Sequence, residues 1–357
     1  MPISSALGSS ALLPAGLGHR NKIINGDMRI AQRGTATITG SVGAQYPVDR
    51  WVVYNGTGTV TFAQSSIAPA GFSNSINATV TATGPYLTSK STEIRQSIEG
   101  FNCQDLAWGT ASAKPIMVSF WVRSSVVGAY NVAIQNSGQS RTYVTSFSIL
   151  VANTWEYKTI QITGDTTGTW LVDNGVGLYL RFQLGMGSIF DTTENTWTSG
   201  LAGATASAID FAANSGATFY LTGVQLEQNY QPTPFEQRPY GTELALCQRY
   251  YYRITNSSTG DVVGSASIGT GGAAFAFIQF PVTMRTRVTA LEQSTYADFN
   301  WFKANDGTQN SLGLITFVRG SVNNATIYPY TSSAGAGQVG YLIGVTVGGY
   351  LGFSAEL

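Results

Sequence analysis

Two short stretches far apart in the chain decide the expected fold: Asn21-Lys-Ile-Ile-Asn-Gly-Asp-Met-Arg-Ile-Ala-Gln-Arg-Gly34 and Gly223-Val-Gln-Leu-Glu227. We expect the first to form an opening strand and the second a closing strand. The phrase Thr233-Pro-Phe-Glu-Gln-Arg-Pro-Tyr-Gly241 follows the second stretch, and its two prolines cannot continue a paired ladder. The two stretches therefore bracket one folded unit.

Between these stretches, apolar residues alternate with polar or aromatic residues at the period of two that is typical of β-strands. The alternation is clear in residues 93–98, 116–123 and 177–184. An apolar face and a polar-aromatic face on successive strands indicate an antiparallel sandwich. The polar-aromatic face of the last two stretches carries Trp121, Arg123, Tyr179, Arg181 and Gln183.

Residues 242–357 are expected to form a second, smaller β-sandwich. Glu243–Gln248 fit one helical turn, with Thr242 as its N-terminal cap. Strand-like stretches separated by Gly, Asn and Ser turns then follow. These stretches are residues 250–254, 275–282, 315–318 and 341–347.

The bracketing stretches and the phrase Glu243-Leu-Ala-Leu-Cys-Gln-Arg-Tyr-Tyr-Tyr252 resemble those of bacteriophage fibre and other virion surface proteins with a carbohydrate-binding-module-like jelly roll. The resemblance covers about residues 21–252. It implies an all-β chain, with a jelly-roll β-sandwich over residues 29–241. Because a variable β domain follows this phrase in the resembling proteins, residues 242–357 are expected to be a distal tip.

Residues 1–28 are expected to be an extended N-terminal arm. They are small and apolar, and their Pro and Gly residues oppose a long helix. Leu12, Leu13 and Leu17 are unusual in a merely solvated tail. We therefore expect the arm to attach the chain to other virion proteins. A floppy terminus is the alternative.

The chain carries few charges. Charged residues make up 11% of it, with 19 basic and 19 acidic residues and a formal net charge of zero. An ordinary globular domain has roughly 25%. Nothing in this balance favours nucleic acid or an anionic membrane as a partner, and neither a signal peptide nor a membrane insertion is expected. Low charge favours a homo-oligomer, and the resemblance to fibres favours a trimer.

Residues that most catalytic sites need are scarce. The one histidine, His19, stands in the expected arm, which argues against a His-based zinc site, a Ser-His-Asp triad or a Cys-His pair. Gly269-Thr-Gly-Gly272 lacks the Lys and the helix of a phosphate-binding loop. Cys103 and Cys247 are expected to be free structural thiols. We expect no enzymatic activity, no cofactor and no metal.

Acidic residues offer two alternatives to this view. Glu93 with Glu99 and Glu227 with Glu236 are pairs of the kind that a glycosidase uses, although solvated or salt-paired acids are the simpler interpretation. Asp27 resembles a position that binds a structural calcium in carbohydrate-binding modules, but no run of partner carboxylates accompanies it.

Sugar binding needs flat aromatic faces flanked by hydrogen-bonding side chains. The polar-aromatic strand faces offer these, and so do the expected tip loops. A subunit interface or a second buried layer is the alternative use of the strand faces. The carbohydrate-binding candidates are Trp121, Arg123, Tyr179, Arg181 and Gln183 on the strands, and Tyr296, Trp301, Phe302, Tyr328 and Tyr330 at the tip.

Together these observations predict a structural protein on the surface of a phage virion, synthesised in the host cytoplasm, most simply a tail or head fibre that binds host surface glycans. A capsid decoration protein without a receptor role and the glycan-binding module of a glycan-active enzyme are the two alternatives. Both share the features used here, except that an enzyme module would normally carry a signal peptide.

Overall fold

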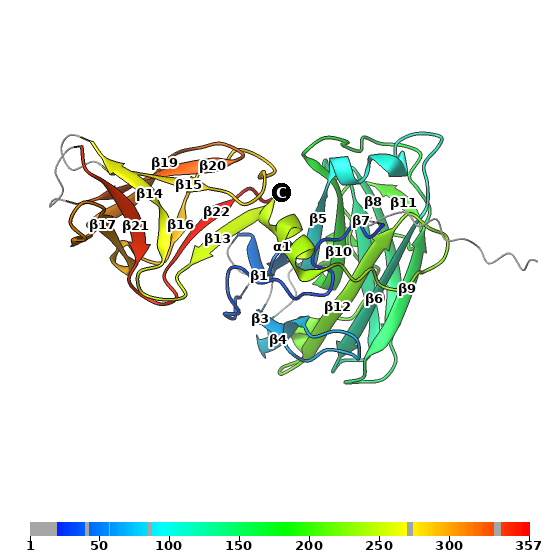
Figure 1. The fold of residues 1–357 in the computed structure, drawn as a ribbon. Helices are drawn as coiled ribbons and strands as arrows, with labels where there is room; N and C mark the ends of the chain where they lie inside the picture. Colours follow the sequence, from blue (N-terminus) through cyan, green and yellow to red (C-terminus); the bar gives the residue numbers. More distant parts are fainter. Residues whose placement is uncertain (1–19, 40–42, 57, 85–87, 270–273, 332–336) are drawn as a thin grey trace, which may run out of the picture.

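The computed structural model describes residues 20–39, 43–56, 58–84, 88–269, 274–331 and 337–357. Two β units lie side by side, and the helix α1 (Tyr240–Gln248) stands where they meet (Figure 1). The predicted fold class is confirmed: a jelly-roll β-sandwich is followed by a smaller all-β sandwich.

Two antiparallel sheets form the first unit, and the predicted strands at 93–98, 116–123 and 177–184 are β5, β6 and β10. The seven-stranded sheet has the order β1 (Gln45–Val48), β2 (Trp51–Tyr54), β5 (Ser91–Glu99), β10 (Val176–Met186), β7 (Gly128–Gln135), β8 (Arg141–Ile149) and β11 (Trp197–Ser199). The five-stranded sheet has the order β3 (Thr59–Ser65), β4 (Ser75–Ala82), β12 (Thr218–Glu227), β6 (Ile116–Ser124) and β9 (Glu156–Ile162).

The core of the first unit lies between these sheets and follows the period of two. Phe120 of β6 and Phe182 of β10 are fully buried and meet edge to face, with ring centroids 5.0 Å apart. Trp51 of β2 packs on Phe182 from the other side. Burial of each such side chain contributes about 2–3 kcal/mol.

The prediction of an extended arm over residues 1–28 is wrong for residues 20–28, the part that the structure describes. Ile23 and Met28 are fully buried in the core, so residues 20–28 belong to the first unit. Nor do residues 21–34 form a regular strand. Lys22 and Gly26 exchange backbone hydrogen bonds with β12, but left-handed φ angles of 57° at Asn25 and 59° at Met28 turn the chain away from a ladder. Residues 1–19, including His19, lie outside the described ranges.

Asn25 fixes the turn in this segment. Its side-chain amide donates to the carbonyls of Ile30 and Asp49, each at 2.9 Å, and its Oδ1 accepts the Ile30 N–H at 3.0 Å. The next residue must be glycine, because a Cβ at position 26 would lie 2.2 Å from the carbonyl oxygen of Val224. The Asn-Gly pair is therefore required by a left-handed turn pressed against β12.

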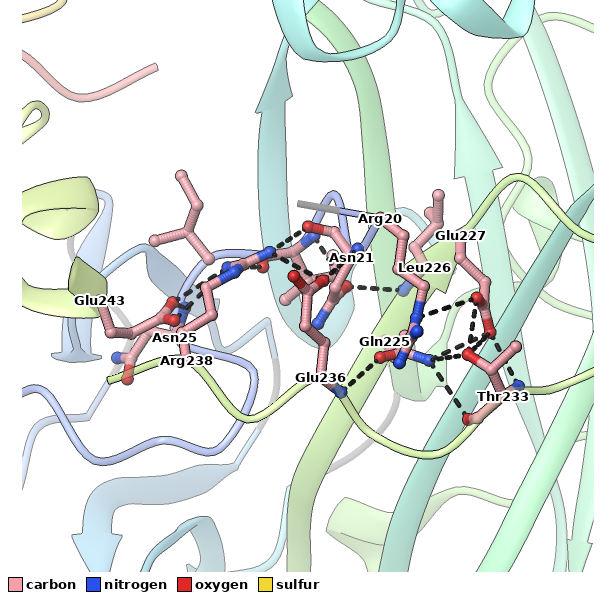
Figure 2. A network of polar contacts seen from close by, with 12 residues as sticks. Arg20, Asn21, Asn25, Gln225, Leu226, Glu227, Thr233, Glu236, Arg238 and Glu243 are labelled. Carbon is pink, nitrogen blue, oxygen red and sulfur yellow. Dashed lines mark hydrogen bonds and ion pairs between the residues drawn. The ribbon is translucent and has the colours of Figure 1, made fainter. Parts of the chain in front are cut away.

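A buried network of polar side chains joins the N-terminal segment to the end of the first unit (Figure 2). Arg238 donates to the backbone carbonyls of Asn21 and Ile23, and its Nη1 lies 3.3 Å from the Glu243 carboxylate. That carboxylate also accepts the N–H of Asn25. The beginning of the unit, its exit and α1 are thus held by one ion pair.

The second unit contains the remaining strands, in a seven-stranded and a three-stranded sheet. The larger sheet has the order β18 (Gln309–Ser311), β17 (Phe299–Lys303), β21 (Val339–Gly344), β14 (Val262–Ile268), β15 (Ala274–Gln279), β20 (Asn324–Tyr330) and β19 (Leu314–Gly320). The smaller sheet has the order β13 (Tyr251–Thr255), β22 (Tyr350–Ser354) and β16 (Glu292–Gln293). Short 3-10 helices include η1 (Gly100–Asn102), η2 (Gln104–Leu106), η3 (Ser188–Phe190), η4 (Phe211–Ala213) and η6 (Tyr296–Asp298).

The helix α1 begins earlier than expected, and its cap differs. Pro239 stands at the N-cap position without a side-chain hydrogen bond, and Thr242 lies inside the helix. Proline suits this end because the first N–H groups of a helix have no intrahelical partner. No helix in the described ranges is long and apolar enough to cross a membrane.

Charged contacts tie the two units together beyond α1. Arg249 donates to Glu99 of β5 at 2.6 Å, and the hydroxyl of Tyr250 donates to the same carboxylate at 2.6 Å. Arg50 of the first unit forms an ion pair with Glu356 near the C-terminus. The C-terminus accordingly lies at the junction (Figure 1).

Cys103 and Cys247 are free and buried, as predicted. Burial raises the pKa of the Cys103 thiol to about 12 and holds the pKa of the Cys247 thiol well above its ordinary value. Neither thiol is a thiolate at neutral pH, so both act as small apolar side chains.

We predict that Asn25→Ala lowers the free energy of unfolding by at least about 3 kcal/mol. The change leaves the Asp49 carbonyl without a donor and the Ile30 N–H without an acceptor, each of which costs about 1–3 kcal/mol. It also forces Ala into a left-handed conformation, which costs about 1 kcal/mol more. Equilibrium unfolding in urea measures the loss. Asn153→Ala is the matched control, because Asn153 has a φ of 58° but an exposed side chain. Equal losses at both positions would contradict the assigned role of the amide.

We also predict that the stability contributed by Asp49 increases as the pH falls. Burial raises the pKa of this carboxyl to about 6 from its ordinary 3.8, although hydrogen bonds from Gln32 lower it. Between these two values the folded chain binds a proton that the unfolded chain does not. From pH 7 to pH 4, the parent should therefore gain up to about 3 kcal/mol over Asp49→Asn in urea unfolding. Parallel pH profiles for the two proteins would refute this.

Candidate functional site

The outward face of the seven-stranded sheet in the first unit carries an unusual set of polar side chains. Pairing in register places Arg95 of β5 opposite Arg181 of β10, and Glu93 opposite Gln183. Tyr54 of β2 pairs with Glu93 from the other side. These residues have the parity opposite to that of the core residues of the same strands.

Glu93 and Arg181 form a buried ion pair at the centre of this face. One carboxylate oxygen of Glu93 accepts from Arg181 Nη2 at 2.6 Å and Nε at 2.9 Å, and from Gln183 Nε2 at 2.8 Å. Arg181 also donates to Gln135 at 3.1 Å. Burial would raise the pKa of Glu93, but Arg181 and Arg95 outweigh it and lower the pKa. Glu93 is therefore an ionised acceptor at neutral pH.

Arg95 lies above this pair, between two aromatic rings. Its guanidinium carbon is 4.6 Å from the ring centroid of Tyr54 and 4.7 Å from that of Tyr179. It also donates to the Tyr54 hydroxyl at 2.7 Å. Cation–π contacts on both sides hold the guanidinium in one orientation. Both tyrosines are half-buried, so part of each ring faces solvent.

A cavity of about 340 Å³ opens beside these residues. Its polar lining includes Tyr54, Lys90, Glu93, Arg95, Gln139 and Arg181. Three of these side chains are cationic and one is anionic, so the wall is electropositive. The volume and the mixture of aromatic and hydrogen-bonding groups suit a small polar ligand. We call this feature the sheet cavity.

Of the five strand candidates, Tyr179, Arg181 and Gln183 lie on the face with the sheet cavity. Arg181 and Gln183 are only 4% and 2% exposed, which corrects their predicted role as direct contacts. The segment 201–205 crosses the face, where Leu201 lines the cavity beside Arg181 and Gly203 lies beside Gln183. Arg181 thus positions Glu93, and Gln183 is a further donor to it.

Trp121 and Arg123 lie on the outward face of the other sheet. Trp121 packs on Tyr157, with ring centroids 5.3 Å apart. Arg123 stacks over Tyr220 and donates to the carbonyl of Asn153 at 2.8 Å. The sandwich core separates these two residues from the sheet cavity, so the five strand candidates do not form one site.

The tip candidates also separate. Trp301 is fully buried in the core of the second unit, which corrects its prediction as an exposed residue. It shares the parity of Phe299, and the intervening residue Asn300 points outward. Tyr296 is exposed in η6. The remaining tip candidates lie on the larger sheet of the second unit, with Phe302 and Tyr328 half-buried and Tyr330 exposed.

Four lining residues were not predicted from the sequence: Tyr54, Lys90, Arg95 and Gln139. Arg95 had a usable signal, since its parity in residues 93–98 is opposite to that of the buried Ile94 and Ile98. Lys90 and Gln139 lie outside the strands, where alternation gives no information. Tyr54 ends a strand of four residues, which is too short for a clear period.

The other acids serve structural contacts. Glu99 binds Arg249 and Tyr250, Glu227 accepts from Thr233, and Glu236 accepts the N–H of Asn21 at 2.7 Å. Asp27 pairs with Arg29 at 2.9 Å. Among the residues that the structure describes, no three His, Cys, Asp or Glu side chains gather as metal ligands would.

No protein-family model and no curated protein sequence matches the chain. Solved structures with a similar fold include the enzymatically active domain of tailspike protein 4 of bacteriophage CBA120, with a TM-score of 0.33, 13% identity and 58% of this chain covered. The match spans only 21% of that tailspike chain.

Two carbohydrate-binding modules are also similar. One is TmCBM61 in complex with β-1,4-galactotriose, with a TM-score of 0.28, 10% identity, and coverage of 58% of this chain and 99% of that chain. The other is the family 11 module of the Clostridium thermocellum cellulase Lic26A-Cel5E, with a TM-score of 0.27, 16% identity, and coverage of 56% and 97%. These likenesses concern the arrangement of strands.

We predict that Glu93→Gln destabilises the first unit by about 3 kcal/mol at pH 7, because it leaves the buried Arg181 without a counter-charge. The lowered pKa of Glu93 means that its ion pair contributes above its ordinary value of 4.5 and is lost as the pH falls through the lowered value. The difference between parent and variant in urea unfolding should therefore shrink below about pH 4.

The control for this prediction is Asp105→Asn. Asp105 pairs with Lys22 at 2.6 Å, but its side chain is 49% exposed. An exposed pair of this kind contributes less than about 1 kcal/mol. A loss at Glu93 no larger than the loss at Asp105 would show that the buried pair is not needed for stability.

Proposed function

We propose that this chain is a non-enzymatic surface protein of a phage virion that binds an acidic host glycan in the sheet cavity. The observation that carries the binding role is the Arg95 guanidinium, fixed between Tyr54 and Tyr179 beside an electropositive cavity. The virion assignment is supported by the resemblance of the bracketing stretches to those of phage fibres. We also propose that the chain forms a homotrimer and that its N-terminal arm attaches it to the particle.

The chemistry of the cavity fits a sugar. The Tyr54 ring lines the cavity and offers apolar surface to the C–H face of a pyranose. Lys90, Gln139 and Arg95 line the cavity and offer donors to hydroxyl oxygens, while the buried Glu93 holds Arg181 and Gln183 in place. Because the Arg95 guanidinium is held between two rings before binding, it loses little conformational entropy when the ligand enters.

The positive wall selects among sugars. Glu93 pairs with Arg181 at 2.6 Å and lies 3.7 Å from Arg95, so one carboxylate faces two guanidinium groups and the wall of Arg95 and Lys90 keeps a net positive charge for a ligand. A carboxylate or phosphate on the glycan would meet both cations near a surface of low dielectric. We therefore propose an acidic glycan and not a neutral one.

A single site of this size binds weakly, because sugar hydroxyls must first lose their water. Several copies on one particle compensate for this, provided that they reach the host surface together. This suits a surface protein of a virion. A decoration protein without receptor role is the second candidate function, favoured by the small cavity volume, and the following experiment separates the two.

We expect the full chain to bind a uronic-acid oligosaccharide more tightly than a neutral one of equal length, measured by titration calorimetry. Tyr54→Ala should weaken binding about tenfold, since an aromatic contact contributes about 1–1.5 kcal/mol. Lys90→Gln should weaken binding of the acidic ligand several-fold and reduce its dependence on salt.

Two controls carry the same chemical changes elsewhere. Trp121→Ala removes an aromatic ring from the opposite sheet, and Lys303→Gln removes a charge from the second unit. Both should leave the dissociation constant unchanged. Equal weakening by Trp121→Ala and Tyr54→Ala, or no binding of any acidic or neutral glycan across an array, would favour the decoration role.

A further inference from the structure

The larger sheet of the second unit exposes an uncharged aromatic face. The pattern of β15 is strictly alternating, with Ala274, Ala276 and Ile278 buried and with Phe275 and Phe277 more than 40% exposed. Tyr341 of β21, on the far side of β14, is 42% exposed. We call the outward side of β17, β21, β14, β15, β20 and β19 the aromatic face.

Register shows that these side chains form continuous rows. Ser265 of β14 pairs with Tyr341 on one side and with Phe277 on the other. Ser267 stands between Val339 and Phe275 in the same way. The rings of Phe275 and Tyr328 extend this row into β20, with centroids 5.9 Å apart. Rings thus flank a strip of serine hydroxyls along the middle of the sheet.

The distribution of exposed apolar residues is unlike that of the first unit. There, large exposed apolar side chains stand in loops or short helices, and Tyr157 is the one that lies within a described strand. Singly scattered residues of that kind are ordinary. In the second unit they concentrate on one sheet: Val262, Phe275, Phe277, Leu314, Val318, Tyr330, Val339 and Tyr341.

Charge is absent from the centre of the aromatic face. Within their bounds, the adjacent strands β21, β14, β15 and β20 contain no Asp, Glu, Lys or Arg. Arg319, opposite Thr326, stands on β19 at the edge of the sheet. Isolated soluble sheets usually place charges where a face or edge could meet another chain, and this one does not.

We propose that the aromatic face binds a second copy of this chain. Two such faces meet without repulsion between like charges, and serine, threonine and tyrosine hydroxyls can each donate and accept, so identical surfaces can pair. The central strands carry no charged residue that could favour a partner of different charge over a second copy.

The area of the face is close to that of a stable interface. Six strands spaced by about 4.8 Å and about 20 Å long give a flat area of roughly 600 Å². Because side chains project from the sheet, its accessible area is larger than the flat area and approaches the roughly 800 Å² per partner of a stable interface. The proposal does not depend on the sheet cavity.

The test is the mass of the full chain in solution, measured by sedimentation velocity between about 1 and 50 µM. We expect Phe277→Glu and Tyr341→Glu, on adjacent parts of the face, each to stay folded and to have about half the mass of the parent, because a self-complementary face joins chains in pairs. Leu150→Glu is the matched control, since Leu150 is 72% exposed in the first unit, and it should keep the parent mass. A monomeric parent, or folded variants with the parent mass, would overturn the proposal.

A second measurement avoids the risk that a charged variant fails to fold. Ser265→Cys places a small thiol at the centre of the aromatic face, while both native cysteines are buried and unreactive. A maleimide dye should label it at least tenfold more slowly at 50 µM than at high dilution. Ser148→Cys, exposed on β8, should label at the same rate at both concentrations. Labelling rates at Ser265→Cys that do not depend on protein concentration would show that no second copy covers the aromatic face. Binding to a glycan array that is lost in Tyr341→Glu would instead show that the aromatic face binds a sugar.

Discussion

The buried charge of Arg238 is the constraint on which the rest of the structure depends. Its side chain is 6% exposed, and a guanidinium removed from water needs a counter-charge and hydrogen-bond acceptors. Compensation comes from Glu243 of α1 and from two backbone carbonyls of the N-terminal segment. These groups are far apart in sequence, so the opening segment, the exit of the first unit and the first helix of the second unit must be placed together.

The same principle explains where a chain with few charges uses them. Arg249 with Glu99 and Arg50 with Glu356 join the units, and Glu93 with Arg181 supports the sheet cavity. In each of these pairs at least one partner is buried. Charges used as internal ties are not available to solvate the sheet faces. The aromatic face is therefore uncharged because the chain has few charged residues and uses many of them in internal ion pairs.

The jelly roll was expected from the resemblance of the bracketing stretches. Alternation in the sequence predicted the strands at 93–98, 116–123 and 177–184 and an antiparallel sandwich, because burial of one face imposes the period of two on a strand. It does not say which residues of the other face stay exposed. Arg181 and Gln183 have the predicted parity, yet the segment 201–205 covers them. Trp301 was misplaced because residues 299–303 were expected to be a tip loop, whereas they form β17 with Trp301 on its buried side. The N-terminal segment failed differently, since its contacts with β12 and α1 are too distant to be visible locally.

The two outward sheet faces show why parity alone cannot assign function. Both carry aromatic residues opposite a buried apolar row. In the first unit, a crossing segment and a buried ion pair turn the face into a cavity with fixed donors and acceptors, which suits a small polar ligand. In the second unit nothing among the described residues crosses the middle strands, and the face stays broad and uncharged, which suits another protein surface. What lies over a sheet, and not the composition of its strands, decides which kind of partner it can bind.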